Sequence, residues 1–293
     1  MRDTFVLSNR IGKNYVVLST FISTSIVFLI LILLMINSWQ VISLSDANLF
    51  SSEWAPYKNS FGILPMLYGT VIVTFISLFL AIPLGIATSI FTAEILPEKY
   101  RYIVKSVLEL LAGIPSIIYG LIGIAFFSIW IQDFFQLQTG RTILTAGILL
   151  SIMILPTIIT LSDDALRSVP KKYREASKGL GLYQYETIRF NLLPIAKSNI
   201  IGAVLLALGR ALGETMAVML VIGSIDEIAS PFYNWLTPGQ TVTSKLGREI
   251  AETSFGSVHF SALIFMGFVL LSIVLVFTII AQHYSKRAER LYE

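Results

Sequence analysis

The chain has 293 residues, of which 55% are hydrophobic and 13% are charged, about half the charged share of a typical soluble domain. The mean hydropathy is +0.77, and the apolar runs reach the roughly 20 residues that a membrane-spanning helix needs. Cysteine is absent, which excludes disulfides and thiolate chemistry. These features indicate an integral membrane protein, in which basic residues report orientation before they suggest nucleic-acid binding.

Six apolar segments are predicted to cross the membrane. They occupy residues 15–42, 63–92, 106–131, 143–162, 197–223 and 260–282. The first is too long for the apolar part of a signal peptide and has no convincing cleavage site, so we expect it to be retained. Pro83 and Pro115 predict bends in the second and third spans, where neighbouring helices can satisfy the freed backbone groups. The predicted fold class is an all-α membrane protein with six transmembrane helices.

Basic residues predict the orientation of these spans. Of the 21 Lys and Arg residues, 16 fall on the side that holds both termini, and Arg210 lies inside a span. The other side holds Lys58, Arg141, Lys245 and Arg248. Because basic residues concentrate in cytoplasmic segments, both termini are predicted to be cytoplasmic.

This topology divides the chain into four parts. Residues 1–14 form a cytoplasmic segment, and 15–62 hold the first transmembrane helix and an outer loop. The main transmembrane domain covers 63–282 and includes the cytoplasmic loop 163–196. Residues 283–293 form a cytoplasmic tail.

The cytoplasmic loop is predicted to contain two short helices. Pro170 precedes KKYREASK and favours a helix start, while Gly179 and Gly181 favour its end. YQYETIRFNLL then predicts a second short helix before Pro194. A solvated basic loop and a docking surface for a cytoplasmic partner both fit this pattern.

The same loop resembles the EAA signature of bacterial ABC importer permeases. The matching residues are Glu175, Ala176, Ser177, Gly181, Leu193 and Pro194. Two positions depart from the signature, since Ser177 replaces its second alanine and Asn191 stands where the family has an aliphatic residue. The resemblance implies that residues around 171–182 form a coupling helix, which inserts into a cleft of a separate ATPase subunit.

Catalysis by the chain itself is not expected. It has no GxxxxGK[ST] loop to hold a nucleotide, so ATP hydrolysis must come from another polypeptide. We expect no cofactor and no metal site, because His259 and His283 are isolated and are interpreted as solvated surface residues.

Arg210 and Glu214 are charged residues inside the fifth predicted span. Arg210 lies about 20 Å along a helix from Lys197, where an arginine costs about 2.5–3.5 kcal/mol on insertion scales. Glu214, at i+4, would share its face and reach it. The pair could lock helix register. Alternatively, Arg210 could present its planar donors to an anionic substrate, while Glu214 holds the arginine in place or exchanges with that anion.

Two rows of small residues run beside this pair. One row is Gly209, Gly213 and Ala217, and the other is Ala203, Ala207 and Ala211. Small residues let membrane helices approach closely, so both rows are interpreted as packing surfaces.

Three longer segments resemble the PstC-type permease of phosphate ABC importers. They are FGILPMLYGT (61–70), ELLAGIPSIIYGLIG (109–123) and GRALGETMAVMLVIG (209–223). The resemblance implies a type I ABC importer permease fold, alternating access, and phosphate passage that needs Arg210 and Glu214. It also implies a bacterial cytoplasmic membrane and four kinds of contact: a PstA-like permease as heterodimer partner, two ATPase subunits, an outer phosphate-binding protein and membrane lipid. Nucleic acid is not among the expected partners.

Other functions remain open from the residues alone. The EAA-like loop is also compatible with an ABC importer for sulfate, molybdate or another solute. A secondary transporter or channel could use Arg210 and Glu214 as a relay, although the coupling loop argues against it. A membrane-bound enzyme is the least supported, since no nucleophile–base or metal constellation is evident.

Overall fold

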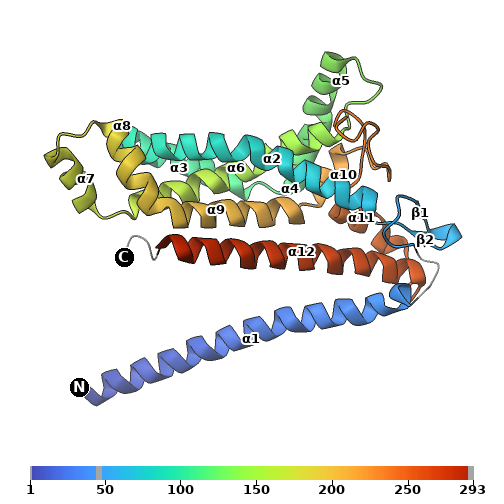
Figure 1. Ribbon diagram of the computed structural model, residues 1–293, viewed down its shortest axis with the longest axis horizontal. Coiled ribbons are helices and arrows are strands. Elements are labelled where there is room, and N and C mark those ends of the chain that lie inside the picture. The colour runs from blue at the N-terminus through green and yellow to red at the C-terminus, as the bar shows by residue number, and fades with distance from the viewer. Residues whose placement is uncertain (1, 44–47, 290–293) are drawn as a thin grey trace.

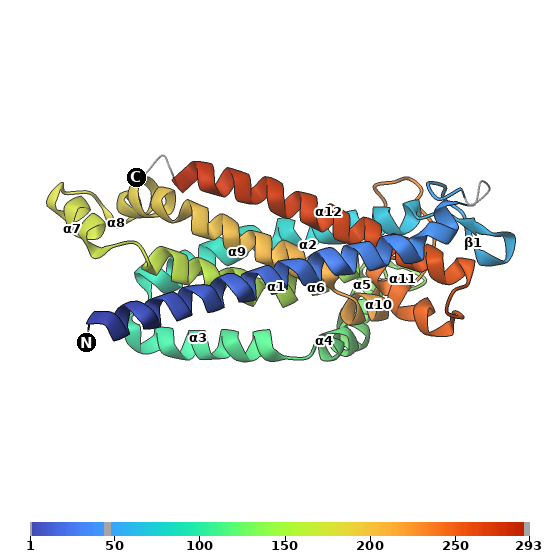
Figure 2. The ribbon, with the colours of Figure 1, turned by 90° about the horizontal axis from the view of Figure 1, so that it is seen from below.

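The computed structural model describes the backbone of residues 2–43 and 48–289, and the side chains of residues 12–43 and 48–280. It is an elongated helical bundle (Figures 1 and 2). Within the described residues, six helices are long and apolar enough to span a membrane: Gly12–Ile42, Leu64–Ile95, Ser116–Phe135, Ile143–Arg167, Gln184–Gly213 and Val258–Ile280. This confirms the predicted six-span fold.

The two ends of the bundle differ in what they carry. Figure 1 places α7 (Lys171–Gly179), the start of α1 (Arg2–Ile42) and the end of α12 (Val258–Glu289) at one end, which we call the α7 end. The opposite end carries α11 (Val242–Glu249) and the short hairpin of β1 (Trp54–Ala55) and β2 (Ser60–Phe61) (Figure 1). We call it the hairpin end.

The first and last spans lie at the edge of the bundle. α1 packs on α12, and the two helices lie closest at the hairpin end and diverge toward the α7 end (Figure 1). The most apolar window of α1 has no buried residue. Val41, Phe61, Met66 and Leu263 belong to one buried cluster, which joins α1 and the hairpin to the rest of the bundle.

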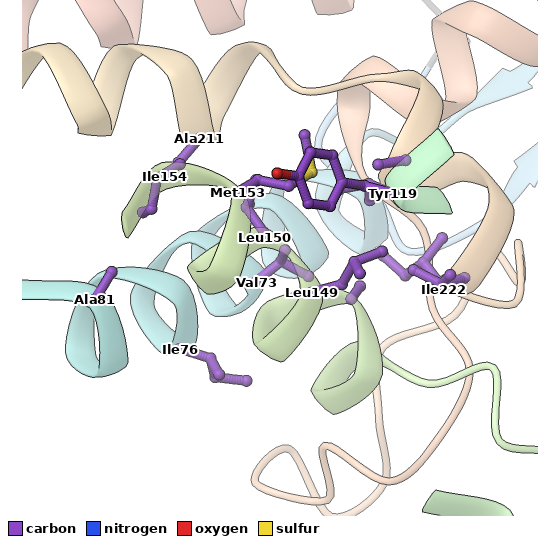
Figure 3. Close-up of a cluster of buried hydrophobic side chains, with 14 of the residues drawn as sticks. Val73, Ile76, Ala81, Tyr119, Leu149, Leu150, Met153, Ile154, Ala211 and Ile222 are labelled. Carbon is purple, nitrogen blue, oxygen red and sulfur yellow. The ribbon is translucent and has the colours of Figure 1, made fainter. Parts of the chain in front are cut away.

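α2 (Leu64–Ile90) and α6 (Ile143–Arg167) form the centre of the bundle. A Cβ on Gly147 would lie 2.6 Å from Ile76, and a Cβ on Gly85 would lie 2.6 Å from Ile158. These glycines therefore let the two helices pack closely. Figure 3 shows the cluster that results, with α6 side chains lying among residues of α2 and Ala211 of α9 (Leu193–Gly213).

The prediction that the third span covers 106–131 was wrong at its start. Residues 106–113 belong to α3 (Glu98–Gly113), an amphipathic helix that has no fully buried residue. The chain is extended at Ile114, with ψ 130°, and the span begins after Pro115. It consists of α4 (Ser116–Ile122), a π-helical segment (Gly123–Ser128) and α5 (Ile129–Phe135).

The fourth and fifth spans also extend further than predicted. α6 continues past residue 162 to Arg167, and Asp163 is buried within it. α8 (Gln184–Glu186) and a π-helical segment (Thr187–Leu192, η4) lead directly into α9, so no separate second short helix precedes Pro194. The wider π-helical turn of η4 accommodates Pro194, which has no backbone N–H to donate to the preceding turn.

The fifth predicted span is broken near its other end. α9 ends at Gly213, and α10 (Met216–Val221) begins after Glu214 and Thr215. Glu214 is in an extended conformation at this break, whereas the sequence suggested one continuous helix.

Candidate functional site

Arg210 lies near the end of α9, facing α6. Its side chain is half-buried, and Nη1 donates a hydrogen bond to Thr157 Oγ1 over 3.2 Å. The predicted ion pair with Glu214 is not present among the described residues. Glu214 has φ −67° and ψ 124°, so it has left the helix, and the i+4 geometry no longer applies.

Glu214 instead fixes the start of α10. Its Oε1 accepts a hydrogen bond from the backbone N–H of Ala217 over 3.2 Å. Its carbonyl oxygen accepts a bond from Thr243 Oγ1 of α11 over 2.7 Å. In the part of the chain that the structure describes, the Arg210 guanidinium therefore has a neutral hydroxyl as its partner and keeps donors free for an anion.

The two rows of small residues have different surroundings. Ala203, Ala207 and Ala211 are buried, as a packing surface requires. The glycine row is different, because a Cβ on Gly209 or Gly213 would find no heavy atom within 4 Å. The prediction that Gly209 and Gly213 pack against a neighbouring helix is thus wrong within this chain.

An exposed surface therefore runs along α9 beside Arg210. It consists of Gly202, Leu206, Gly209 and Gly213, and we call it the open strip. Toward the α7 end, Gly202 also lines a cleft of about 460 Å³ between α6 and α9, with Asp164, Ser168 and Asn199. The face of α9 that carries Arg210 is thus accessible and becomes polar toward the α7 end.

α7 projects beyond the bundle at the α7 end (Figure 1). It begins after Pro170, as predicted, and Gly181 has φ +75°, a conformation that favours glycine. Glu175 and Ala176 are exposed, whereas Ser177 is fully buried. Leu193 and Pro194 lie in the first turn of α9, and Leu193 packs against a buried cluster that includes Leu166 and Ile188.

An ion pair joins α7 to the end of the second span. Arg174 contacts Glu94 through Nη2–Oε1 at 2.6 Å and Nε–Oε2 at 3.2 Å, a bidentate arrangement. The same guanidinium donates to the carbonyl oxygens of Val169 over 2.7 Å and of Leu166 over 2.9 Å. Sequence reasoning missed this pair because its members are 80 residues apart.

The segment that carries Glu94 is a meeting point for several elements. It is a π-helical turn (Phe91–Ile95, η2) whose terminal carbonyls need partners outside the helix. Arg101 of α3 donates to the carbonyls of Thr92 and Ala93, and Gln184 donates to the carbonyl of Glu94 over 2.8 Å. Thr92 also donates to Asp163 of α6 over 2.7 Å. We call this segment the η2 hub.

A charged cluster at the hairpin end was not predicted. Lys245 is 3% exposed and pairs with Asp226 and with Glu249, the latter over 2.6 Å. His259 contacts Glu249 over 3.0 Å, so it is not the solvated residue that was expected. His283 lies outside the described side chains.

The pKa of Glu249 reflects two opposing influences. Burial raises this pKa. The hydrogen bond and the charge of Lys245, followed by those of His259, lower it, and together they outweigh the effect of burial. The pKa of this carboxyl is therefore held below its usual value, and the cluster favours the ionised form.

The sequence profile of the binding-protein-dependent transport system inner membrane components matches residues 81–290. This chain belongs to that family. It is therefore a multi-pass membrane permease, a transport subunit of the ABC importer class.

Several curated relatives have similar sequences. The probable ABC transporter permease protein YqgH of Bacillus subtilis is 40% identical over 242 residues, covering 82% of this chain and 77% of the relative. The phosphate transport system permease protein PstC of Mesorhizobium japonicum is 34% identical over 273 residues, covering 86% and 82%. PstC of Pasteurella multocida is 31% identical over 317 residues, covering 99% and 98%.

Solved structures share the fold of the permease. A bacterial alginate ABC transporter, in complex with an alginate-bound periplasmic protein, matches with a TM-score of 0.64 at 17% identity, covering 96% of this chain and 97% of the other. The inward-facing MetNI methionine ABC transporter matches with a TM-score of 0.60 at 16% identity, covering 77% and 97%. At these identities the match establishes the type I ABC importer permease fold alone.

Proposed function

We propose that this permease passes inorganic phosphate through the cytoplasmic membrane of a bacterium as one subunit of an ATP-driven importer. Its PstC relatives are named as phosphate transport permeases. The observation that carries the proposal is Arg210, a cation within a transmembrane helix that has no ion pair among the described residues.

Arg210 suits a tetrahedral oxyanion for physical reasons. A guanidinium donates two parallel hydrogen bonds to phosphate, and a low-polarity environment strengthens such bonds. The open strip leaves space for a substrate next to this side chain, because a Cβ on Gly209 or Gly213 would find no atom of this chain within 4 Å. Glu214 supports the site by fixing α10 rather than by neutralising the arginine.

The α7 end suits an ATPase partner. Three large side chains near α7 are mostly exposed: Leu180 at 79%, Tyr183 at 72% and Tyr185 at 64%. Glu175 and Ala176 of α7 are exposed as well, so this end of the protein presents a partly apolar surface to a partner. We assign Glu175, Ala176, Ser177, Gly181, Leu193 and Pro194 to coupling with one of the two ATPase subunits that hydrolyse ATP in the importer. The α7 end, and with it both termini, would be cytoplasmic.

The remaining partners follow from the two other free surfaces. The open strip of α9 would face a PstA-like permease, so that the pathway lies between the two permeases. A phosphate-binding protein would deliver substrate at the hairpin end, and alternating access would then carry phosphate past Arg210. Residues 63–282 would form the transport domain, with residues 15–62 as an added span and loop.

Phosphate uptake into vesicles tests this proposal. The vesicles would contain this chain with its PstA-like, ATPase and binding-protein partners, and wild type would be compared with Arg210→Gln and Arg210→Lys. Lys197→Gln is the matched control, since Lys197 is an exposed cation on the same helix. We expect ATP-dependent uptake that sulfate does not inhibit, lost in Arg210→Gln, partly kept in Arg210→Lys and unchanged in the control.

Each contrary result points to a different error. Competition by sulfate or molybdate would replace phosphate with another oxyanion. Uptake that needs no ATP would indicate a secondary transporter. Full uptake by Arg210→Gln would limit Arg210 to a structural contact with Thr157.

A further inference from the structure

The basic residues of the hairpin end fall into two groups. Lys58 pairs with Glu53 over 2.9 Å, and Lys245 pairs with Asp226 and Glu249. Arg141 and Arg248, in contrast, have no carboxylate partner among the described residues. Both lysines thus have carboxylate partners, and the two arginines do not.

The two arginines line one cavity. Its volume is about 360 Å³, with Arg141, Arg248, Gly223 and Ser224 on its walls and with Met219 and Leu220 of α10 also lining it. The carboxylates Asp226 and Glu249 contact Lys245 rather than either arginine, and neither of them lines the cavity. The lining of the cavity therefore carries two cationic side chains, no carboxylate and several apolar side chains.

The backbone at Gly223 and Ser224 brings the arginines together. Both residues have positive φ, +94° and +63°. A Cβ on Gly223 would lie 2.7 Å from the carbonyl oxygen of Arg141, so only glycine permits this approach. Arg248 reaches the same turn from α11, where its Nη1 lies 3.5 Å from the carbonyl oxygen of Ser224.

Two uncompensated guanidinium groups in one cavity favour an anion. Like charges repel, and a bound oxyanion relieves that repulsion while accepting hydrogen bonds from both groups. A concave site of one charge also raises the local concentration of the opposite ion. Few basic residues lie on the outer side of a membrane protein, so two arginines without carboxylate partners are unusual there.

The cavity lies one short helix away from Arg210. α10 has six residues, or about 9 Å at 1.5 Å per residue, and it connects the turn at Gly223 to the break at Glu214. We infer that Arg141 and Arg248 form an outer anion site, which receives inorganic phosphate before it reaches Arg210. This inference rests on the proposed function.

The first experiment separates phosphate capture from protein docking. The assembled importer in vesicles is compared with its Arg141→Gln/Arg248→Gln and Arg141→Lys/Arg248→Lys forms, with Lys58→Gln as a control on the same side. At saturating phosphate-loaded binding protein, we expect the Gln pair to lower maximal uptake about tenfold. ATP hydrolysis and the affinity for the binding protein should stay unchanged, and the Lys pair should restore part of the uptake.

A second experiment detects phosphate in the cavity directly. Since the chain has no cysteine, Ser224→Cys introduces a unique thiol into the cavity wall. Inorganic phosphate should slow labelling of this thiol by a charged thiol reagent. The protection should disappear when the Gln pair is added to Ser224→Cys.

The contrary outcomes are distinct. Unchanged uptake in the Gln pair, or labelling that phosphate does not slow, would overturn the anion site. A fall in affinity for the binding protein that matches the fall in uptake would make these arginines docking contacts instead. Absence of phosphate uptake by wild type would refute the proposed function itself, whatever the labelling shows.

Discussion

Asn191 donates a hydrogen bond from its side-chain amide to the hydroxyl of Ser177 over 2.6 Å. These residues are the two positions at which the segment 163–196 departs from the EAA pattern. Ser177 is fully buried, and its hydroxyl also lies 2.9 Å from the carbonyl oxygen of Tyr173, to which it donates. The two departures therefore satisfy each other and tie α7 to the η4 segment.

This pairing predicts non-additive mutations. Ser177→Ala leaves the Asn191 amide without its partner, and Asn191→Leu leaves the Ser177 hydroxyl with one bond fewer. Each single change should cost about 1–3 kcal/mol of stability, while the double change should cost less than the sum. Thermal unfolding of the four proteins measures the cycle, and additive costs would show that the two residues are independent.

The ion pair between Arg174 and Glu94 predicts a charge-reversal rescue. Arg174→Glu or Glu94→Arg alone should weaken coupling to the ATPase, because α7 loses its direct contact with the η2 hub. Each change also leaves a half-buried charge without its partner, which should cost about 2 kcal/mol of stability. The double reversal should recover part of the phosphate uptake.

The informative readout for this pair is the ratio of phosphate imported to ATP hydrolysed. Lys99→Glu serves as a control, because Lys99 is an exposed cation of α3 and lies outside the coupling helix. Equal loss in both single variants and in the double reversal would show that local folding, rather than transmission, depends on these residues.

Gly209 and Gly147 predict opposite consequences of the same substitution. A Cβ on Gly209 would meet no atom of this chain within 4 Å, so Gly209→Leu should fold normally. The leucine would fill the open strip, however, and should lower uptake about tenfold or more. Gly147→Leu forces a clash with Ile76 and should destabilise the fold by about 1–3 kcal/mol. Protein yield, unfolding temperature and uptake distinguish the two, and normal uptake by Gly209→Leu would remove the open strip from the pathway.

Glu249 predicts a loss of stability in acid. Since its folded-state pKa lies below the ordinary value of 4.5, the ionised carboxyl stabilises the fold above pH 4.5. That contribution is lost as the pH falls through the lowered folded-state pKa. Glu249→Gln should show a smaller fall in unfolding temperature on acidification than wild type. Glu252→Gln, at an exposed neighbouring position, should behave like wild type.

Some features of the fold can be predicted from local sequence, because length and hydropathy decide whether a segment spans the membrane. The helix α7 was also predictable from local sequence, because Pro170 and Gly181 restrict or permit backbone conformations at their own positions. The start of the third span was missed because Leu110 and Leu111 are apolar, although they lie on an amphipathic helix outside the span.

The candidate site was less predictable. Arg210 was identified because a charge is costly in the membrane, but its expected partner assumed one continuous helix through Glu214. Gly213 and the β-branched Thr215 were the available signals of that break. No local pattern predicts that Glu94 meets Arg174, since tertiary packing alone brings them together.

The contrast between the first and fourth spans has a consequence for mutational tolerance. None of the most apolar window of α1 is buried inside the protein, whereas 67% of the corresponding window of α6 is. In α1, hydrophobicity and length are the requirements, so exchanges among Leu, Ile, Val and Phe should be nearly neutral. In α6, shape matters as well, because each side chain fills a defined space. In a saturation-mutagenesis map of this permease, tolerance should therefore follow hydrophobicity in α1 and side-chain volume in α6.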